Sequence, residues 1–513
     1  MTGKTWPMLS KWRINLFTVV LFGAVGLIFY RLFYLTYLQH DVLSKIAEGQ
    51  YQNQQENSVR RGHIYIRDLS TGEKQLVALQ KSFPYVFSKK DGRFKIVDKN
   101  PPPAEVERLR QESGQETSLG YEDGRYYPEG SFLAQVLGFL GFDENRRVGQ
   151  YGLEAYYDET IRKENDLILT IDKNIQSFAE KELDYLLDKW RPVSGTVIVQ
   201  DPQTGAILAM AGSPSFDPNN YGNYPLGNFV NKAVQEAFEP GSSFKPITMS
   251  GALDKKKVTP ETTYFDTGEV EIAGYKIKNF NEKSFGTQTM SQVLEKSLNT
   301  GAMFVESQLG DDDFLNYVIN FGFGQATGID LAGEAAGDTS NLYSKRKINF
   351  LTASFGQGIS VTPIQLVNAY SAIANGGKLM RPYVVKKVVK PSGETKETKP
   401  EVIGTPISEK TSAQVKAMLV GVVEKGFDKA KVKGYDVAAK TGTAQIASPK
   451  GGYSEEFIHD MVGFAPAFSP RFVVLIKMDK PQGIRFAADS LSPSLGNITR
   501  FLLNYFQIPP TRQ

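Results

Sequence analysis

The chain has 513 residues, which is long enough for two to four domains and a large buried core. Its 59 lysines and arginines nearly balance its 56 aspartates and glutamates, so the net charge of +3 provides no basic field of the kind that attracts nucleic acid. The absence of cysteine excludes disulfides, iron–sulfur clusters, cysteine-ligated zinc and cysteine nucleophiles.

An apolar run near the N-terminus predicts a membrane anchor. Residues 14–30 are almost wholly apolar, and the run continues to about residue 38, which is close to the length that spans a bilayer. Basic residues precede the run and no acidic residue occurs before Asp41, so the positive-inside bias keeps residues 1–13 in the cytoplasm and places the rest of the chain outside. A cleaved signal peptide is the alternative, but the small residues 23–26 interrupt the run rather than end it. We predict one transmembrane helix over residues 14–38.

The region after the anchor, residues 39–165, lacks a clear periodicity. Its short mixed segments are broken by Pro101-Pro102-Pro103 and by the turn-rich residues 114–130. We therefore expect an irregular, small α+β stem, or pedestal, domain. The pattern changes at residue 166, where an apolar strand leads into an amphipathic helix, so a compact domain is predicted over residues 166–513.

Helices and strands alternate within the predicted compact domain. Residues 195–199 and 206–210 are apolar runs joined by a turn that contains Pro and Gly, which predicts an antiparallel hairpin. Ser408 should open a helix that Gly426 ends as its C-cap, and residues 472–476 are interpreted as a buried central strand. The predicted fold class is α+β, with a central antiparallel sheet covered by helices.

Three short polar strings in this domain indicate its chemistry. The first, Ser242-Ser243-Phe244-Lys245, is followed by Pro246, which is tolerable only in a first helical turn, so Ser242 should lie at a helix N-terminus. Lys245 then shares a helix face with Ser242, whereas Ser243 points away. Because a desolvated lysine can be neutral, Ser242 is a candidate nucleophile and Lys245 its base.

The other two strings are Ser297-Leu298-Asn299 and Lys440-Thr441-Gly442-Thr443. A loop or turn at the second string would let both polar side chains point into one cleft. The third string follows an apolar run and is expected in a strand, where Gly442 would admit a substrate backbone. Residues 434–441 are also one residue short of a phosphate-binding P-loop, which would instead require a helix that begins at Lys440.

Histidine is a poor alternative base for the serine. The chain contains only His40, His63 and His459, and no G-x-S-x-G motif accompanies them. A metal centre is not predicted either. Asp311-Asp312-Asp313 directly precedes an apolar helical run, where acidic residues favour a helix N-terminus. We expect neither a metal nor a cofactor.

The order S-x-x-K, S-x-N and K-T-G resembles the signature of penicillin-binding proteins and serine β-lactamases. Longer strings are similar to those of class B penicillin-binding proteins, the monofunctional peptidoglycan D,D-transpeptidases. These strings are residues 239–246, Gly152-Leu153-Glu154, Leu169-Thr170-Ile171-Asp172, Gly328-Ile329-Asp330-Leu331 and Phe355-Gly356-Gln357-Gly358-Ile359. The resemblance extends over roughly residues 125–480, and the predicted anchor fits it.

The resemblance implies acyl transfer through a serine ester. Ser242 would attack the carbonyl between the two terminal D-alanines of a peptidoglycan stem peptide, and Lys245 would take its proton. Ser297 would relay a proton to the departing D-alanine, and Asn299 would hold the peptide amide. The amine of a second stem peptide would then release the acyl group as a cross-link, and β-lactams would inhibit the enzyme.

The same resemblance implies a carboxylate site at the third string. Lys440, Thr441 and Thr443 would hold the terminal carboxylate of the stem peptide, beside Gly442. The backbone N–H groups of Ser242 and Thr443 would form the oxyanion hole.

Other fates of the acyl-enzyme define the alternatives. A D-Ala-D-Ala carboxypeptidase would use water as the acceptor, and a β-lactamase would need a second base, for which Glu334 is the candidate. A penicillin-sensing receptor or an inactive scaffold of a division complex is the non-enzyme alternative. An inactive scaffold would be expected to lose one of the three strings, and all three are present.

The resemblance also suggests a cellular context. Residues 278–286 and 356–363 are similar to the septal branch of the family, which favours a role in cell division over side-wall growth. The expected partners are stem peptides, β-lactams, the cytoplasmic membrane, a polytopic glycosyltransferase, and proteins of the division or elongation complex.

Overall fold

The structure is a computed structural model. It describes residues 11–34, 60–90, 93–99, 101–111, 117–144, 146–272, 274–280, 282–447 and 452–512. The chain divides into two compact units, residues 1–59 with 142–147 and residues 60–141 with 148–513.

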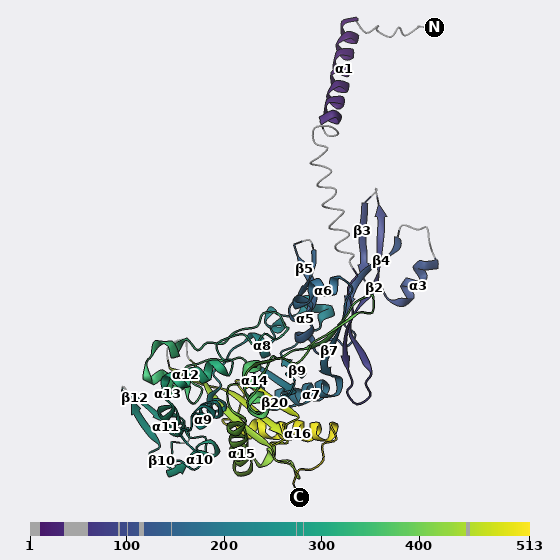
Figure 1. The fold of residues 1–513 in the computed structure, drawn as a ribbon. Coiled ribbons are helices and arrows are strands. Elements are labelled where there is room, and N and C mark those ends of the chain that lie inside the picture. Colours follow the sequence, from purple (N-terminus) through teal and green to yellow (C-terminus); the bar gives the residue numbers. More distant parts are fainter. Residues whose placement is uncertain are drawn as a thin grey trace, which may run out of the picture. The chain divides into compact units, whose positions relative to one another are not determined.

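The first unit contains one long apolar helix, α1 (Lys11–Phe33), drawn in purple in Figure 1. Its segment Asn15–Phe33 has a mean hydropathy of 2.1 and is long enough to cross a bilayer. The predicted anchor is therefore helical over its described part, whereas residues 35–38 of the predicted span lie outside the described residues. The helix fits a membrane anchor.

The second unit contains a seven-stranded mixed sheet. Its strands are β1 (Ile64–Arg67), β2 (Lys74–Lys90), β3 (Arg93–Lys99), β4 (Thr117–Tyr126), β7 (Asp166–Asp172), β15 (Val385–Val389) and β16 (Thr395–Glu397). They pair in the order β16-β15-β7-β1-β2-β3, and β4 also pairs with β2. Strands from both sides of residue 166 therefore share this sheet, and the domain boundary at that residue stays a prediction.

The expectation of irregular structure in the stem is wrong for β2 and β4. β2 has 17 residues, and all ten residues of β4 pair with it. Pro84 in β2 and Gly120 in β4 are residues that normally indicate a break in a strand. A Cβ on Gly120 would lie only 2.4 Å from the ring of Tyr85. The aromatic ring packs onto this glycine, and that long-range contact is not visible in the local sequence.

Shorter elements of the same region are α3 (Pro103–Gln111), α4 (Ala134–Leu137), β5 (Phe139–Asp143), β6 (Arg146–Gln150), α5 (Gly152–Tyr156) and α6 (Asp158–Arg162). Glu154 of α5 is fully buried and accepts hydrogen bonds from Arg61 (2.7 Å) and Arg125 (2.6 Å). Burial opposes the charged form of Glu154, but the charges of Arg125 and Arg61 outweigh it and hold the pKa of the carboxyl below its usual value. This ion cluster ties α5 to β4 and to the residues before β1.

A five-stranded antiparallel sheet forms the core of the remaining chain, with β18 at one edge. In spatial order its strands are β18 (Ala438–Ala447), β19 (Tyr453–Ala465), β20 (Phe472–Asp479), β8 (Ser194–Gln200) and β9 (Ile207–Ser213). The predicted hairpin at β8 and β9 and the predicted central strand β20 are confirmed, and every residue of β20 is buried. The α+β prediction with a helix-covered antiparallel sheet is thus confirmed.

Helices cover both faces of this sheet. On one face, α7 (Lys173–Trp190) and α16 (Ala487–Tyr505) pack on Val197, Met461 and Ile476. On the other face, α14 (Pro363–Ala374) packs on Ile198 and Leu475. Because side chains alternate along a strand, consecutive residues of the central strands enter different cores.

The other α-helices and strand pairs lie outside the five-stranded sheet, together with the 3-10 turn η4. They are α8 (Lys232–Gln235), η4 (Gly241–Phe244), α9 (Lys245–Asp254), α10 (Met290–Glu295), α11 (Asn299–Leu309), α12 (Asp311–Asn320), α13 (Lys347–Ala353), α15 (Glu409–Gly426), and the strand pairs β10–β13 (Thr263–Asp266, Gly286–Thr289), β11–β12 (Glu269–Ile272, Tyr275–Lys278) and β14–β17 (Leu379–Met380, Val402–Gly404). Ser408 caps α15 as predicted, since its side chain accepts from the N–H of Thr411. Gly426 is the last helical residue and Phe427 is the cap, so the predicted C-cap is wrong by one residue.

Candidate active site

Ser242 lies at the start of a helical segment, as predicted. It belongs to the 3-10 turn η4, which leads directly into α9. Gly241 has a φ of 55° and donates its N–H to the carbonyl oxygen of Gly356 (3.0 Å), which fixes the entry to the turn. Ser242 is partly exposed, whereas Ser243 is fully buried and donates to the carbonyl oxygen of Pro240 (2.8 Å). Ser242 is therefore the accessible serine of the pair.

Lys245 connects the first string to the second. Its Nζ lies 2.9 Å from Oγ of Ser242, 2.5 Å from the carbonyl oxygen of Ser297 and 2.8 Å from Oδ1 of Asn299. The side chain is 1% exposed. Burial lowers the pKa of Lys245 far below its usual value, and the positive charge of Lys440 lowers it further. A neutral amine at this position can accept the proton of Ser242.

Ser297 and Asn299 reach Lys245 because the backbone turns between two helices. Ser297 follows α10 with a φ of 56°, a left-handed conformation that is uncommon for residues other than glycine. Asn299 is the first residue of α11, and its Nδ2 donates to the carbonyl oxygen of Lys278 (2.9 Å). The turn directs both polar side chains toward Nζ of Lys245, as the sequence predicts.

The third string lies on the edge strand β18, which excludes the P-loop interpretation because no helix begins at Lys440. Nζ of Lys440 lies 2.9 Å from Oγ of Ser297 and 3.1 Å from the carbonyl oxygen of Thr441. Burial lowers the pKa of Lys440 to about 7, and the charge of Asp460 opposes this shift. The hydroxyl of Ser297 therefore lies between two buried lysines, since its Oγ is also 3.2 Å from Nζ of Lys245.

Gly442 is required by its neighbours within the protein. A Cβ at this position would lie 2.3 Å from the carbonyl oxygen of Pro240 and 2.0 Å from Oδ2 of Asp460. Thr441 is nearly buried, and Thr443 is half-buried with its Oγ1 accepting from the N–H of Ala487 (3.1 Å). The part that these residues play in binding a carboxylate, and the predicted oxyanion donors, stay predictions.

Comparison with known proteins agrees with this geometry. Residues 195–499, more than half of the chain, match the family described as penicillin binding protein transpeptidase domain. The chain belongs to this family. It is 36% identical to stage V sporulation protein D of Bacillus subtilis over 422 residues, which are 76% of this chain and 65% of that protein. It is 30% identical to the peptidoglycan D,D-transpeptidase FtsI of Escherichia coli over 450 residues, which are 82% of this chain and 74% of that protein.

Solved structures of penicillin-binding proteins have the same fold. Penicillin binding protein 3 of Mycobacterium tuberculosis, complexed with aztreonam, aligns with a TM-score of 0.73 and 26% identity over 89% of this chain and 99% of that one. Penicillin binding protein 2X of Streptococcus thermophilus aligns with a TM-score of 0.77 at 21% identity, over 87% of this chain and 79% of that one, which supports the fold alone. The prediction of a class B penicillin-binding protein, a serine-type D,D-transpeptidase, is confirmed at the level of the family.

Two residues named as alternative bases are engaged elsewhere in this penicillin-binding protein. Nδ1 of His459 lies 2.9 Å from Oγ of Ser490, and its Nε2 lies 3.1 Å from the carbonyl oxygen of Arg485. Burial lowers the pKa of His459 to about 4. The carboxylate of Glu334 accepts hydrogen bonds from the backbone N–H groups of Thr327 (2.7 Å) and Gly328 (3.0 Å). The geometry favours neither residue as the base of a triad or of a β-lactamase.

The predicted helix start at the acidic string is confirmed. Asp311 is the first residue of α12 and pairs with Lys347 (2.5 Å), and Asp313 pairs with Lys255 (2.8 Å). These carboxylates form ion pairs with lysines, an arrangement that differs from a metal-binding cluster.

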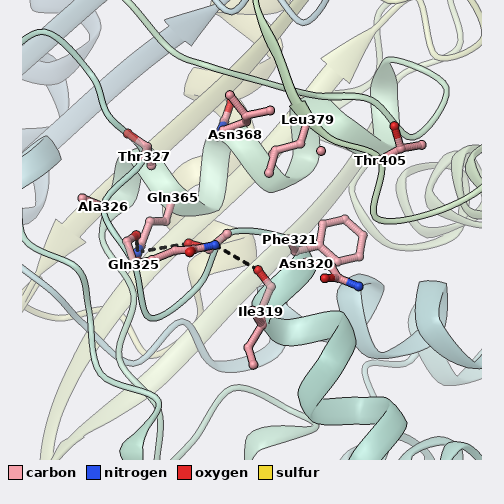
Figure 2. A pocket seen from close by; sticks show the side chains of 13 residues that line it. Ile319, Asn320, Phe321, Gln325, Ala326, Thr327, Gln365, Asn368, Leu379 and Thr405 are labelled. Carbon is pink, nitrogen blue, oxygen red and sulfur yellow. Dashed lines mark hydrogen bonds between the residues drawn. The ribbon is translucent and has the colours of Figure 1, made fainter.

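A pocket of about 300 Å³ is lined by residues outside the three strings. Figure 2 shows its lining side chains. Its lining includes Phe321, Gln325, Gln365 and Asn368. Two of its polar side chains are paired, because Gln365 donates to the carbonyl oxygen of Gln325 (2.8 Å) and Asn368 donates to that of Met380 (3.0 Å).

The sequence did not identify Asp460 as part of the site region. This buried residue of β19 lies behind Gly442, and its charge acts on Lys440. The available signal was an acidic residue inside the apolar stretch that forms β19.

Proposed function

We propose that this protein cross-links peptidoglycan stem peptides through an acyl-enzyme on Ser242. One observation carries the proposal: Oγ of Ser242, a partly exposed residue, lies 2.9 Å from a buried lysine whose pKa is far below its usual value. Serine is a weak nucleophile until a neighbouring base removes its proton. Lys245 supplies that base in a site where neither nitrogen of His459 contacts the serine.

Acylation begins when Oγ of Ser242 attacks the carbonyl carbon of the penultimate D-alanine. The proton of the hydroxyl passes to Nζ of Lys245, and the C–N bond to the terminal D-alanine breaks. The departing amine receives a proton through the hydroxyl of Ser297, which contacts both lysines and can exchange protons with either. Asn299 holds Lys245 through Oδ1, and one N–H of its amide donates to the carbonyl oxygen of Lys278. The second N–H of this amide would hold the substrate peptide.

The substrate would bind along β18. This strand is the edge of its sheet, so an extended peptide can add to it by backbone hydrogen bonds. Lys440, Thr441 and Thr443 would bind the terminal carboxylate, and Gly442 keeps the strand close to the turn that carries Ser242. The N–H groups of Ser242 and Thr443 would stabilise the oxyanion.

The group that accepts the acyl chain from Ser242 distinguishes a transpeptidase from a carboxypeptidase or a β-lactamase. An amine from a second stem peptide yields a cross-link, whereas water yields the product of a carboxypeptidase. Rapid hydrolysis of β-lactams would need a second base near the ester, and Glu334 is engaged with backbone N–H groups. An inactive scaffold is disfavoured because the contacts among Ser242, Lys245 and Ser297 are intact.

The test uses the full chain in detergent with a fluorescent penicillin. Ser242→Ala should abolish covalent labelling while the thermal unfolding temperature stays near that of the wild type. Ser243→Ala is the matched control and should still be labelled. Labelling of Ser242→Ala would refute the assignment of the nucleophile. With a D-Ala-D-Ala peptide and a D-amino acid acceptor, mass spectrometry should detect the transfer product in excess over the hydrolysis product.

The cellular setting is also part of the proposal. With α1 as the anchor and its basic flank in the cytoplasm, the catalytic domain would lie outside the cytoplasmic membrane. The resemblance of residues 278–286 and 356–363 to the septal branch of the family supports a septal role, with a polytopic glycosyltransferase and division proteins as partners. A fluorescent fusion should concentrate at midcell during division, and a uniform side-wall signal would contradict this role.

A further inference from the structure

Asp460 is a buried carboxyl group directly behind the third string. On β19 it pairs in register with Gly442, and its side chain is 0% exposed. Oδ2 lies so close to Gly442 that a Cβ there would be 2.0 Å away. Neither carboxylate oxygen has a hydrogen-bond partner among the described residues. A buried carboxyl group without partners costs free energy, so its retention calls for a compensating charge or a function.

Two lysines on neighbouring strands face this carboxyl group. Lys440 lies two residues before Gly442 on the same face of β18, and Lys477 of β20 pairs in register with Asp460. Lys477 already forms an ion pair with Asp479, which also accepts a hydrogen bond from Ser194 (2.5 Å). Lys440 has hydrogen bonds only to oxygens of Ser297 and Thr441 among the described residues. Asp460 is therefore the carboxylate whose charge is available to Lys440.

The remaining neighbours come from η4 and α14. The hydroxyl of Ser243 favours the charged form of Asp460, although its hydrogen bond goes to the carbonyl oxygen of Pro240. The phenol of Tyr370 donates to the carbonyl oxygen of Ser243 (2.7 Å), and the charge of Asp460 helps to keep that phenol protonated. Neither group neutralises the carboxylate, so the charge balance rests on the lysines.

The protonation states of three buried groups are coupled: Asp460 acts on Lys440, and Lys440 acts on Lys245. Burial raises the pKa of Asp460 to about 7, against the opposing effects of Ser243, Lys440 and Lys477. The negative charge of Asp460 favours the protonated form of Lys440. The positive charge of Lys440 in turn favours the neutral form of Lys245. Removal of the first charge should therefore change the protonation of both lysines.

We propose that Asp460 is a positioning residue for acylation, whose negative charge keeps the proton on Lys440 and thereby leaves Lys245 as the neutral base. The inference rests on the proposed function of Ser242 and Lys245. Asp460 does not touch the substrate in this arrangement, because its side chain is fully buried. Lys440 remains a cation that can bind a carboxylate and donate to Ser297, and Lys245 remains able to accept a proton.

The test is the pH profile of acylation by a chromogenic β-lactam, measured by stopped flow on the full chain in detergent. The wild type should show a bell-shaped profile, with an acid limb from Lys245 and an alkaline limb from Lys440. Asp460→Asn removes the charge and keeps the shape of the side chain. Its alkaline limb should move to lower pH by about one unit, so that the rate at about pH 8 falls roughly tenfold. Its acid limb should move to higher pH, which narrows the bell.

Asp479→Asn is the matched control, because Asp479 is also buried on this face of the sheet but pairs with Lys477. This variant should lose stability without a shift of either limb. Asp460→Ser places a smaller uncharged group against Gly442 and should give the same narrowed pH profile. It serves as the test variant if Asp460→Asn folds poorly. Unmoved limbs in the folded Asp460 variants would overturn the inference. Absence of acylation in the wild type would instead refute the proposed function.

Discussion

The role of the Ser297 hydroxyl can be tested with two substitutions that both remove it but differ in their effect on backbone strain. Oγ of Ser297 lies 3.2 Å from Nζ of Lys245 and 2.9 Å from Nζ of Lys440. The residue has a φ of 56°, a conformation that glycine adopts without strain. Ser297→Ala removes the hydroxyl and keeps the strain, whereas Ser297→Gly removes both.

The two effects have different magnitudes. Loss of a group that transfers protons lowers the rate by about 100- to 10,000-fold, which corresponds to about 3 to 5 kcal/mol of transition-state stabilisation. We expect a loss in this range for acylation by both variants of Ser297. Strain relief at a left-handed position, less the entropy cost of glycine, should make Ser297→Gly about 0.5 to 1 kcal/mol more stable than Ser297→Ala.

The assay combines stopped-flow acylation by a chromogenic β-lactam with thermal unfolding of the same samples. We expect equal losses of acylation rate in the two variants and a higher unfolding temperature for the glycine variant. An acylation rate within threefold of wild type in either variant would refute the role of the hydroxyl. A difference of more than tenfold between the variants would show that loop geometry, rather than the hydroxyl, limits the reaction.

Two further predictions concern residues outside the site. Glu154→Gln leaves the guanidinium groups of Arg61 and Arg125 without their buried carboxylate, so chemical denaturation should show a loss of about 3 to 5 kcal/mol, with penicillin labelling retained in the folded fraction. His459→Asn should leave acylation unchanged, since both ring nitrogens are engaged away from Ser242. The pKa of His459 falls from 6.5 to about 4 in the folded protein, so the unfolding free energy of the wild type should decrease as the pH drops through this range, and the variant should lose that part of the pH dependence.

The sequence was sufficient where the signal is local. The hairpin of β8 and β9, the central strand β20 and the helix start at Ser242 follow from turn residues, apolar runs and the position of Pro246. The contact between Ser242 and Lys245 follows from their helical spacing. The approach of the second string to Lys245, and of Lys440 to Ser297, came from family resemblance, because no spacing rule joins residues more than fifty positions apart.

The sequence was insufficient where distant residues decide the outcome. β2 and β4 form long strands although Pro84 and Gly120 suggest breaks, because Tyr85 packs onto the glycine. The need for glycine at position 442 was assigned to substrate approach, whereas the structure places Pro240 and Asp460 against it. Asp460 itself became significant only when the register of β19 with β18 was known.

The chemistry of this site depends on charge balance in the protein interior. The pKa of a histidine is near neutral without assistance, whereas the pKa of a lysine must be lowered by several units before its amine can act as a base at neutral pH. Burial displaces the pKa of Lys245, and a second buried cation, Lys440, adds to the shift. That second cation is itself disfavoured by burial, since its pKa is lowered to about 7. A buried negative charge on the neighbouring strand favours the protonated form of Lys440, and Asp460 of β19 provides it. Substitution of Asp460 should therefore alter the pH range of acyl transfer without any contact to the substrate.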